Sequence, residues 1–195
     1  MTDPEHRKVK AEEIIQVASH LFSTRGYDAT SLKDIADEVG LHKTSLFHYF
    51  KNKEEILMGI MDQSLNEHLT ILDEIVNDPR LTGMEKLKYA LEKQVLVTCK
   101  YKDHINVYLS EIRSLSSENQ KKYKSKRKDY EGYFDKIIRE IQADEGTDLF
   151  KGLNPRLVRF GLLGMCNWVI KWYSDTGPMK AQDIADDFYR MVTKK

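Results

Sequence analysis

The chain has 195 residues, which is enough for one large domain or two small ones. Its 10 glycines, 4 prolines and 32% charged residues are typical of a helical globular protein. The 31 basic and 31 acidic side chains give a formal net charge of +0, which argues against a protein that only coats nucleic acid, so any DNA contact must come from a local basic patch.

The N-terminal quarter of the chain is predicted to form three helices. Apolar side chains recur at helical spacing over residues 5–25. Either Thr30 or Ser31 is expected to cap a second helix, and a third helix is expected over His42–Phe50. Because a Lys-Asn-Lys sequence then breaks the pattern, we predict a first domain of residues 1–52.

The second predicted domain, residues 53–195, is expected to be helical as well. No segment shows strand alternation between turn signals, so we predict an all-α fold of about nine helices. A strong start signal is Asn154-Pro155, an N-cap followed by a proline in the first turn. The expected helices of this domain cover residues 53–77, 84–102, 103–115, 118–143, 155–172 and 180–192.

The segment from Ser31 to Phe50 has the spacing of a helix-turn-helix. Ala36 is small where two helices must approach closely, and Gly40 can adopt the left-handed conformation of a sharp turn. Residues 40–53 carry three lysines, two histidines and no acid, as expected if the second helix of the pair faces phosphate. An ordinary helical hairpin has the same spacing, so a helical protein-interaction module without a role on DNA is the alternative.

Residues 14–57 resemble the DNA-binding region of the TetR family of bacterial transcriptional repressors. The motifs that carry the resemblance are Ile14–Gly26, Ala29-Thr30-Ser31, Ile35-Ala36, Val39-Gly40-Leu41, Lys43–Phe50 and Lys51–Leu57. The order Phe-His-Tyr-Phe at residues 47–50 departs from the family's commoner Tyr-Tyr-His-Phe. The resemblance implies an all-helical homodimer whose recognition helices enter successive major grooves of a palindromic operator in double-stranded DNA. It also implies that the operator is released when a small-molecule effector binds the larger domain.

Ten residues are candidates for contact with DNA. Thr30 and Ser31 begin the second helix, where free amides and a hydroxyl suit a phosphate, although either residue can equally be a plain helix cap. Lys53 resembles the family's phosphate-contacting lysine, and a solvated lysine is the alternative. Thr44 and Ser45 can hydrogen-bond to base edges. The remaining candidates, whose aromatic members can instead belong to the core, are His42, Lys43, Phe47, His48 and Tyr49.

Residues 157–170 are apolar on almost every side of the predicted helix. Such a helix must be buried all round, which favours a core on one side and a partner subunit on the other. Glycines would let another backbone approach closely, and a central core helix in a monomer is the alternative. The residues expected at the dimer interface are Leu157, Gly161, Gly164, Met165 and Phe188.

An effector pocket is expected where aromatic walls carry a few polar tips, although each such residue can also be ordinary core. Residues 121–128 form a basic run, which is either a solvated helix face or a phosphate-binding patch. In the second case Lys124, Arg127 and Lys128 would bind the phosphates of a coenzyme A thioester. The candidate pocket residues are Tyr108, Ile112, Tyr130, Phe134, Asn167, Trp168 and Trp172.

The identity of the effector rests on a second resemblance. Residues 168–184 look like regulators of acyl-CoA or steroid-ring degradation within the TetR family. This resemblance implies a hydrophobic or amphipathic effector such as an acyl-CoA thioester, whose acyl chain would enter the apolar interior. Another hydrophobic effector is the alternative.

The sequence predicts neither an enzyme nor a membrane protein, and it predicts no cofactor or metal. Cys99 and Cys166 fit no metal-ligand spacing and are expected to be buried thiols in a reducing cytoplasm. We find no nucleophile–base–acid set and no glycine-rich phosphate loop. No apolar run reaches the ~18 residues of a transmembrane helix, and no secretory signal precedes the first helix. We therefore predict a cytoplasmic, ligand-responsive DNA-binding repressor.

Overall fold

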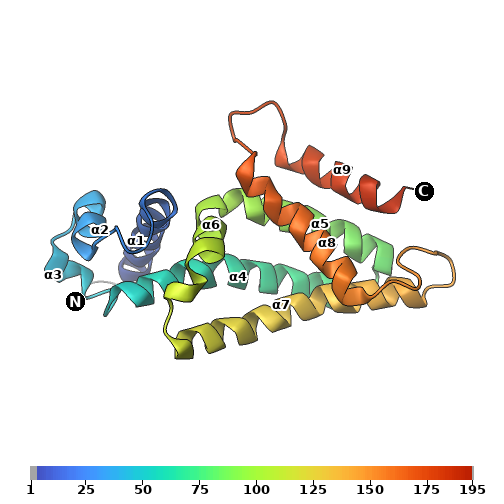
Figure 1. The fold of residues 1–195 in the computed structure, drawn as a ribbon, viewed down its shortest axis with the longest axis horizontal. Helices are drawn as coiled ribbons and strands as arrows, with labels where there is room; N and C mark the ends of the chain where they lie inside the picture. The colour runs from blue at the N-terminus through green and yellow to red at the C-terminus, as the bar shows by residue number, and fades with distance from the viewer. Residues whose placement is uncertain (1–3, 195) are drawn as a thin grey trace. The chain divides into compact units, whose positions relative to one another are not determined.

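The computed structural model describes residues 4–194, and Figure 1 shows that the chain is built from helices. No strand occurs within this range, so the predicted all-α fold is confirmed. None of the described helices combines the length and the apolar character that a membrane crossing demands. The elements are α1 (Pro4–Arg25), α2 (Leu32–Val39), α3 (Lys43–Leu46), α4 (Lys53–Asn77), α5 (Gly83–Lys100), α6 (Lys102–Glu111), the 3₁₀ turn η1 (Ile112–Ser114), α7 (Ser117–Ala143), α8 (Pro155–Trp168), the 3₁₀ turn η2 (Val169–Lys171) and α9 (Ala181–Thr193).

The described residues divide into two compact units. Helices α4 and α7 contribute residues to both of them. The predicted domain boundary after residue 52 stays a prediction, and the outer ends of the two predicted domains, residues 1–3 and 195, lie outside the described residues. The two units, which we name the head unit and the body unit, comprise residues 4–64 with 103–123 and residues 65–102 with 124–194, respectively.

Local caps determine where α2 begins and ends. The Ser31 hydroxyl accepts a hydrogen bond from the backbone N–H of Asp34, and the Ser31 N–H donates to the Asp34 carboxylate at 2.7 Å. This capping box satisfies amides that would otherwise lack partners. At the other end Gly40 has a φ of 72°, and the N–H of Leu41 donates to the Ala36 carbonyl at 2.8 Å. The predicted cap and turn are therefore confirmed.

Helix α3 is shorter than the sequence pattern predicts. It covers Lys43–Leu46 instead of His42–Phe50, and the chain continues through turns in which the His48 N–H donates to the Ser45 carbonyl at 3.1 Å. These bonds from residue i+3 to residue i tighten the backbone. Phenylalanine, histidine and tyrosine also have weaker helix propensity than leucine or alanine. The predicted extent of this helix is therefore wrong, although its position is right.

The head unit has an apolar core to which α1, α2 and α4 each contribute one face. The anchor Leu46 is only 1% exposed, so the short α3 is fixed to this core by its last residue. The buried apolar residues of the core include Ile14, Ala18, Leu21, Phe22, Ile35, Ala36, Val39, Phe50, Ile56, Leu57 and Ile60.

Helix α6 belongs to the head unit, and polar contacts attach it to α1 and α4. The Asn106 amide donates to the Ser23 hydroxyl of α1 at 3.0 Å. The buried ring of His104 forms a hydrogen bond with the Gln63 side chain of α4 at 2.8 Å. The predicted single helix over residues 103–115 is interrupted, because η1 follows α6 before the segment ends.

In the body unit α5 packs against α8 and α9. A capping box between Thr82 and Glu85 starts α5, and the predicted Asn154 cap starts α8. A Cβ at Gly83 would lie 3.0 Å from Cγ1 of Ile141 in α7, so these two helices approach more closely there than a larger residue allows. The predicted helix over residues 155–172 changes to a 3₁₀ turn in its last part.

The two cysteines are free thiols in different surroundings. Cys166 is buried, and burial raises the pKa of its thiol to about 12. Cys99 is half-buried, and desolvation raises the pKa of its thiol to about 11. The predicted buried thiol is therefore confirmed for Cys166, whereas Cys99 is less buried than predicted.

Candidate functional site

The α3 segment, which we define as residues 42–49, presents polar side chains on the outside of the head unit. Leu46 points inward and holds the segment in place. Phe47 is 48% exposed, so it lies on the surface and outside the core. The segment contains no acidic residue. Its exposed or half-buried side chains are those of His42, Lys43, Thr44, Ser45, Phe47, His48 and Tyr49.

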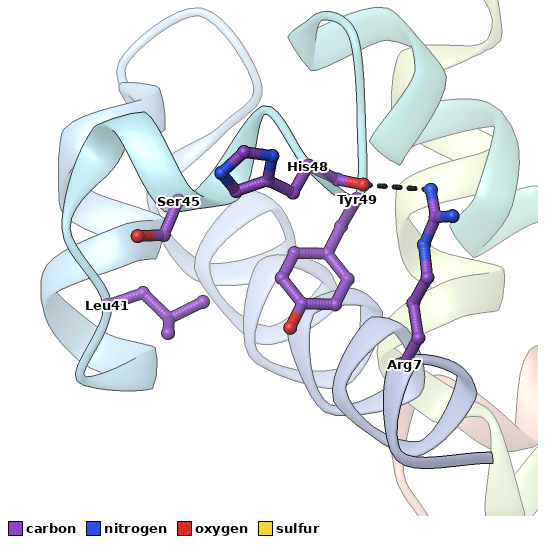
Figure 2. Close-up of a pocket in the computed structure, with 5 residues that line it drawn as sticks. All are labelled: Arg7, Leu41, Ser45, His48 and Tyr49. Atoms are coloured by element: carbon purple, nitrogen blue, oxygen red, sulfur yellow. Dashed lines mark hydrogen bonds between the residues drawn. The ribbon is translucent and has the colours of Figure 1, made fainter. Parts of the chain in front are cut away.

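An open groove of about 610 Å³ lies beside the α3 segment. Figure 2 shows its five lining residues, with Leu41 and Ser45 on the far side from Arg7 of α1. The hydroxyl of Ser45, the imidazole of His48 and the hydroxyl of Tyr49 can each donate or accept a hydrogen bond. Such groups suit either the base edges or the phosphates of a nucleic acid.

Arg7 is a candidate contact that the sequence reasoning missed. Its guanidinium donates to the backbone carbonyl of His48 at 2.9 Å (Figure 2). The Lys10 ammonium makes a similar contact with the carbonyl of Val39 at 3.3 Å. Arg7 therefore supports the α3 segment and adds positive charge beside the groove, whereas Lys10 supports the end of α2. The basic residues at the start of the first helix are the sequence signal for this role.

Thr30 and Ser31 differ in their access to solvent. Thr30 is 1% exposed, and its hydroxyl donates to the Gly26 carbonyl at 2.9 Å, closing the connection between α1 and α2. The predicted contact of Thr30 with a phosphate stays a prediction, and in this structure its hydroxyl is occupied by the bond to Gly26. Ser31 is exposed, but its N–H and its hydroxyl both contact the Asp34 carboxylate. Those bonds lower the pKa of Asp34, so a phosphate at Ser31 would compete with a resident anion.

Lys53 holds the start of α4 against the connection between α1 and α2. Its ammonium donates to the Tyr27 carbonyl and lies 4.0 Å from the centroid of the Tyr27 ring. Burial lowers the pKa of Lys53, and the nearby carboxylates of Asp28 and Glu111 oppose that effect. The side chain is half-buried, and its contact with phosphate stays a prediction.

The basic run is less uniform than its sequence suggests. Lys124 and Lys128 are exposed on α7, as a phosphate patch requires. Arg127 is half-buried, forms an ion pair with Glu131 at 3.4 Å and stacks over the Tyr130 ring at 5.4 Å. Its charge is therefore already partly neutralised, whereas the two lysines remain accessible.

The predicted pocket residues do not form one group. Tyr108 and Ile112 lie in the head unit, whereas the other five lie in the body unit. There Tyr130 and Phe134 are buried, with ring centroids 5.7 Å apart. Trp168 is 65% exposed and Trp172 is 41% exposed in the single chain, and their place in an effector pocket stays a prediction. The structure thus brings together only part of the predicted set.

Gln94 of α5 connects two of the predicted pocket residues and was missed from the sequence. The Tyr130 hydroxyl donates to Oε1 of Gln94 at 2.8 Å, and Nε2 of Gln94 donates to Oδ1 of Asn167 at 3.2 Å. Thr98 accepts a longer bond from the same Nε2 at 3.4 Å, and the His68 ring packs edge-on against Tyr130 at 5.4 Å. The signal was a glutamine on the apolar face of a predicted helix.

One face of α8 is apolar and exposed in the single chain. Leu157 is 66% exposed and Phe160 is 48% exposed. A Cβ placed at Gly161 or Gly164 would meet nothing within 4 Å, so this face is open. The opposite face carries the buried residues of the core. The predicted interface residues Met165 and Phe188 are half-buried, and the dimer contact itself stays a prediction.

The fold and the exposed α3 segment define a helix-turn-helix DNA-binding protein. Residues 14–59 match the family described as bacterial regulatory proteins, tetR family. Residues 80–195 match the family described as tetracyclin repressor-like, C-terminal domain, and this match alone spans more than half of the chain. The chain belongs to the TetR family of bacterial transcriptional regulators.

Proteins similar to this chain are transcriptional regulators. The HTH-type transcriptional repressor KstR2 of Mycolicibacterium smegmatis is 28% identical over 199 residues, which cover 97% of this chain and 91% of the relative. The structure of the TetR family regulator PfmR from Thermus thermophilus has a TM-score of 0.82 at 30% identity and covers 92% of this chain and 96% of that one. AibR, solved in complex with isovaleryl coenzyme A and operator DNA, has a TM-score of 0.80 at 25% identity and covers 94% of this chain and 97% of that one.

Proposed function

We propose that this TetR-family regulator is a repressor that binds a palindromic operator as a homodimer and leaves it when an acyl-CoA thioester binds the body unit. The observation that carries the proposal is the α3 segment, where exposed polar side chains surround the buried anchor Leu46 beside a groove that Arg7 lines. A repressor and a regulator solved with an acyl-CoA are among the similar proteins. Such a regulator would act in the cytoplasm, where it meets both DNA and coenzyme A thioesters.

On DNA, the α3 segment would enter the major groove. The hydroxyls of Thr44 and Ser45 would read base edges, and the exposed Phe47 ring would contact a thymine methyl group. Lys43 and Arg7 would bind phosphates, contacts that position the protein without reading sequence. Because the net charge of the whole chain is +0, attraction to DNA would be confined to this surface.

Recognition of a palindrome requires two copies of the head unit. Half-sites one helical turn apart place the two recognition elements roughly 34–36 Å from each other. The open apolar face of α8, which includes Leu157 and Gly161, would provide the contact between subunits. A stable interface of this kind buries about 2,000 Å² or more and is apolar.

The effector would bind the body unit in two parts. The acyl chain would take the apolar interior, while exposed Lys124 and Lys128 would bind nucleotide phosphates. Helix α4 contributes residues to both units, so a change of packing around its second half would alter the support of the head unit. For complete switching the effector must bind the off-DNA state about 10⁴-fold more tightly than the on-DNA state.

Fluorescence anisotropy tests the proposal directly. A labelled duplex from the region upstream of the chain's own gene is titrated with protein, and octanoyl-CoA is then added at up to 100 times the protein concentration. We expect tight binding to this duplex, much weaker binding to a scrambled duplex, and release by octanoyl-CoA but not by free coenzyme A. Binding to the duplex that no acyl-CoA of any chain length reverses would contradict the proposed effector class.

A further inference from the structure

A chain of hydrogen bonds runs through the interior of the body unit and has a direction. Tyr130 is 2% exposed, and its hydroxyl donates to Oε1 of Gln94, which is also 2% exposed. Nε2 of Gln94 in turn donates to Oδ1 of Asn167. The three residues come from α7, α5 and α8, so the chain links three helices. We name Tyr130, Gln94 and Asn167 the amide relay.

Each side chain of the amide relay donates to the next one, so the amide N–H group of Asn167 at its end has no acceptor within the relay. Because Gln94 donates to Oδ1 of Asn167, the amide nitrogen of Asn167 points away from the relay, and it donates to no other group among residues 4–194. Asn167 is half-buried, whereas Gln94 and Tyr130 are fully enclosed. The relay therefore begins in the core and ends in an unused N–H group at an accessible position.

The unused donor keeps contact with solvent, because the amide nitrogen of Asn167 is not among the buried unpartnered side-chain atoms of residues 4–194. A ligand acceptor would therefore replace water at this N–H group. Because the relay already fixes the orientation of the Asn167 amide, a ligand loses less conformational entropy when it binds there. This favours a ligand with an acceptor in the matching position. The arrangement is thus suited to the recognition of a fixed acceptor atom.

We propose that the amide relay recognises a neutral carbonyl oxygen of the effector, namely the thioester carbonyl of an acyl-CoA. This inference rests on the proposed function and specifies which atom of the effector the body unit reads. The amide of Asn167 donates to the carbonyl oxygen, while Gln94 and Tyr130 hold that amide in place and do not touch the ligand. Asn167 is the binding residue, and the other two are positioning residues.

The chemistry of the surroundings favours a neutral acceptor over a carboxylate. The relay consists of two amides and a phenol, and Thr98 and His68 lie against it. Arg127 stacks on the Tyr130 ring of the relay, and its charge is already paired with Glu131. A free carboxylate in this place would lack the counter-charge that a buried anion requires.

The position of the relay on α7 also fits a thioester. Lys124 precedes Tyr130 by six residues on the same helix, a distance of about 9 Å along the axis at 1.5 Å per residue. The exposed side chain of Lys124 is therefore followed along α7 by the enclosed side chain of Tyr130, the first member of the relay. A coenzyme A thioester has the same order of groups, with charged phosphates outside and an uncharged carbonyl at the start of the acyl chain.

A pair of ligands tests the carbonyl directly. Octanoyl-CoA carries the thioester carbonyl, and S-octyl-CoA has the same coenzyme and the same number of acyl carbons but a thioether in its place. Isothermal titration calorimetry measures both dissociation constants on the purified full chain. We expect the wild-type protein to bind octanoyl-CoA at least tenfold more tightly than S-octyl-CoA, because only the thioester accepts from Asn167.

Variants then assign this preference to the relay. Asn167→Leu removes the donor and Gln94→Met removes its support, so both should bind the two ligands with affinities within about twofold of each other. Gln142→Met makes the same side-chain change elsewhere in the body unit and should keep the tenfold preference. If Gln94→Met fails to fold, Asn167→Leu at its less buried position and the wild-type ligand pair still decide the question.

The outcomes separate this inference from the proposed function. Equal affinity of the wild-type protein for the two ligands, or a preference that survives in Asn167→Leu, would overturn the role of the relay and leave acyl-CoA as the effector. Binding of neither ligand would overturn the effector class and the carbonyl contact with it. A tenfold preference that disappears in both relay variants and persists in Gln142→Met supports the proposal.

Discussion

The head unit and the body unit place their polar and apolar groups in opposite ways. The head unit keeps an apolar core and exposes polar side chains on the α3 segment. The body unit encloses hydrogen-bonded polar groups around Gln94 and exposes an apolar face on α8. A polar surface suits a hydrated polyanion such as DNA, whereas an exposed apolar face suits a second protein chain.

The two units also differ in the free-energy cost of their polar side chains. Exposed polar side chains retain their hydration until DNA is bound, so the head unit can carry many of them at little cost. Enclosed polar groups must each find a partner, because an unpaired one costs about 1–3 kcal/mol. The enclosed side chains of Gln94 and Tyr130 meet this requirement through their hydrogen bonds. The donor that we assign to the effector is the accessible amide of Asn167.

The largest effect is expected from adding charge to the apolar face of the body unit. Trp168, the last residue of α8, is exposed like Leu157. The double substitution Leu157→Glu and Trp168→Glu should give a monomer and lower operator affinity by about 100-fold or more, because a single head unit loses the gain of binding both half-sites. Analytical ultracentrifugation and gel shift measure the two effects. Leu109→Glu alters another exposed leucine, on α6, and should remain dimeric. A dimeric double variant would contradict this use of α8.

The next largest effects are expected on the α3 segment. Thr44→Ala should cost about 1–3 kcal/mol on the operator and relax the preference at one base position. Lys43→Ala should weaken binding to all duplexes alike and reduce the slope of log K against log salt by about 1. Anisotropy titrations at several salt concentrations measure both, with Lys88→Ala on α5 as the exposed-lysine control. Unchanged slopes for Lys43→Ala would argue against phosphate contact.

A smaller effect concerns His104, a buried histidine of the head unit. Burial lowers the pKa of His104 to about 4, below its unfolded value of about 6.5. As the pH falls, the unfolded chain therefore takes up a proton before the folded chain does. The contribution of neutral, buried His104 to the free energy of unfolding is complete above pH 6.5 and is lost as the pH falls towards 4. Between pH 7 and pH 5 the loss should be about 2 kcal/mol.

Urea unfolding at the two pH values measures this loss. The variant His104→Gln keeps a side chain that can contact Gln63 but cannot titrate in this range, so its free energy of unfolding should depend less steeply on pH. The same pH dependence in the wild type and the variant would show that His104 is not desolvated as the structure indicates.

The smallest effect is expected from Arg7, at the edge of the DNA-facing surface. Arg7→Ala removes the bond to the His48 carbonyl together with one positive charge and should weaken operator binding about threefold to tenfold. Arg7→Lys keeps the charge but loses the planar guanidinium, so its operator affinity should lie between those of the wild type and Arg7→Ala. Surface plasmon resonance resolves these differences, and wild-type affinity for Arg7→Ala would exclude a role in support or contact.

The helix-turn-helix could be predicted because its signals are local. The Ser31 cap, the left-handed Gly40 and the anchor Leu46 each act through neighbours within a few residues. The extent of α3 and the burial of Thr30 could not be predicted in the same way. Thr30 is buried against the Gly26 carbonyl at the end of α1, and the turns after α3 carry a bond from Arg7 of α1. Sequence spacing does not encode these contacts.

The effector region was harder to predict for the same physical reason. Tyr130 and Phe134 were recognised as candidates, but Gln94 was hidden on a helix face that reads as ordinary core. Trp168 and Trp172 were predicted to line an effector pocket, whereas the single chain leaves both exposed. A residue on an open apolar face cannot be distinguished from a core residue until the packing of its helix is known.

The central claim is that two copies of this chain present two α3 segments to one stretch of DNA. Size-exclusion chromatography with light scattering of the purified full chain, alone and with the duplex from its own locus, tests that claim most directly. We expect twice the 22.8 kDa chain mass without DNA, and a complex with an even number of chains per duplex. A mass of one chain in dilute solution, together with no shift of any duplex from the locus, would contradict it.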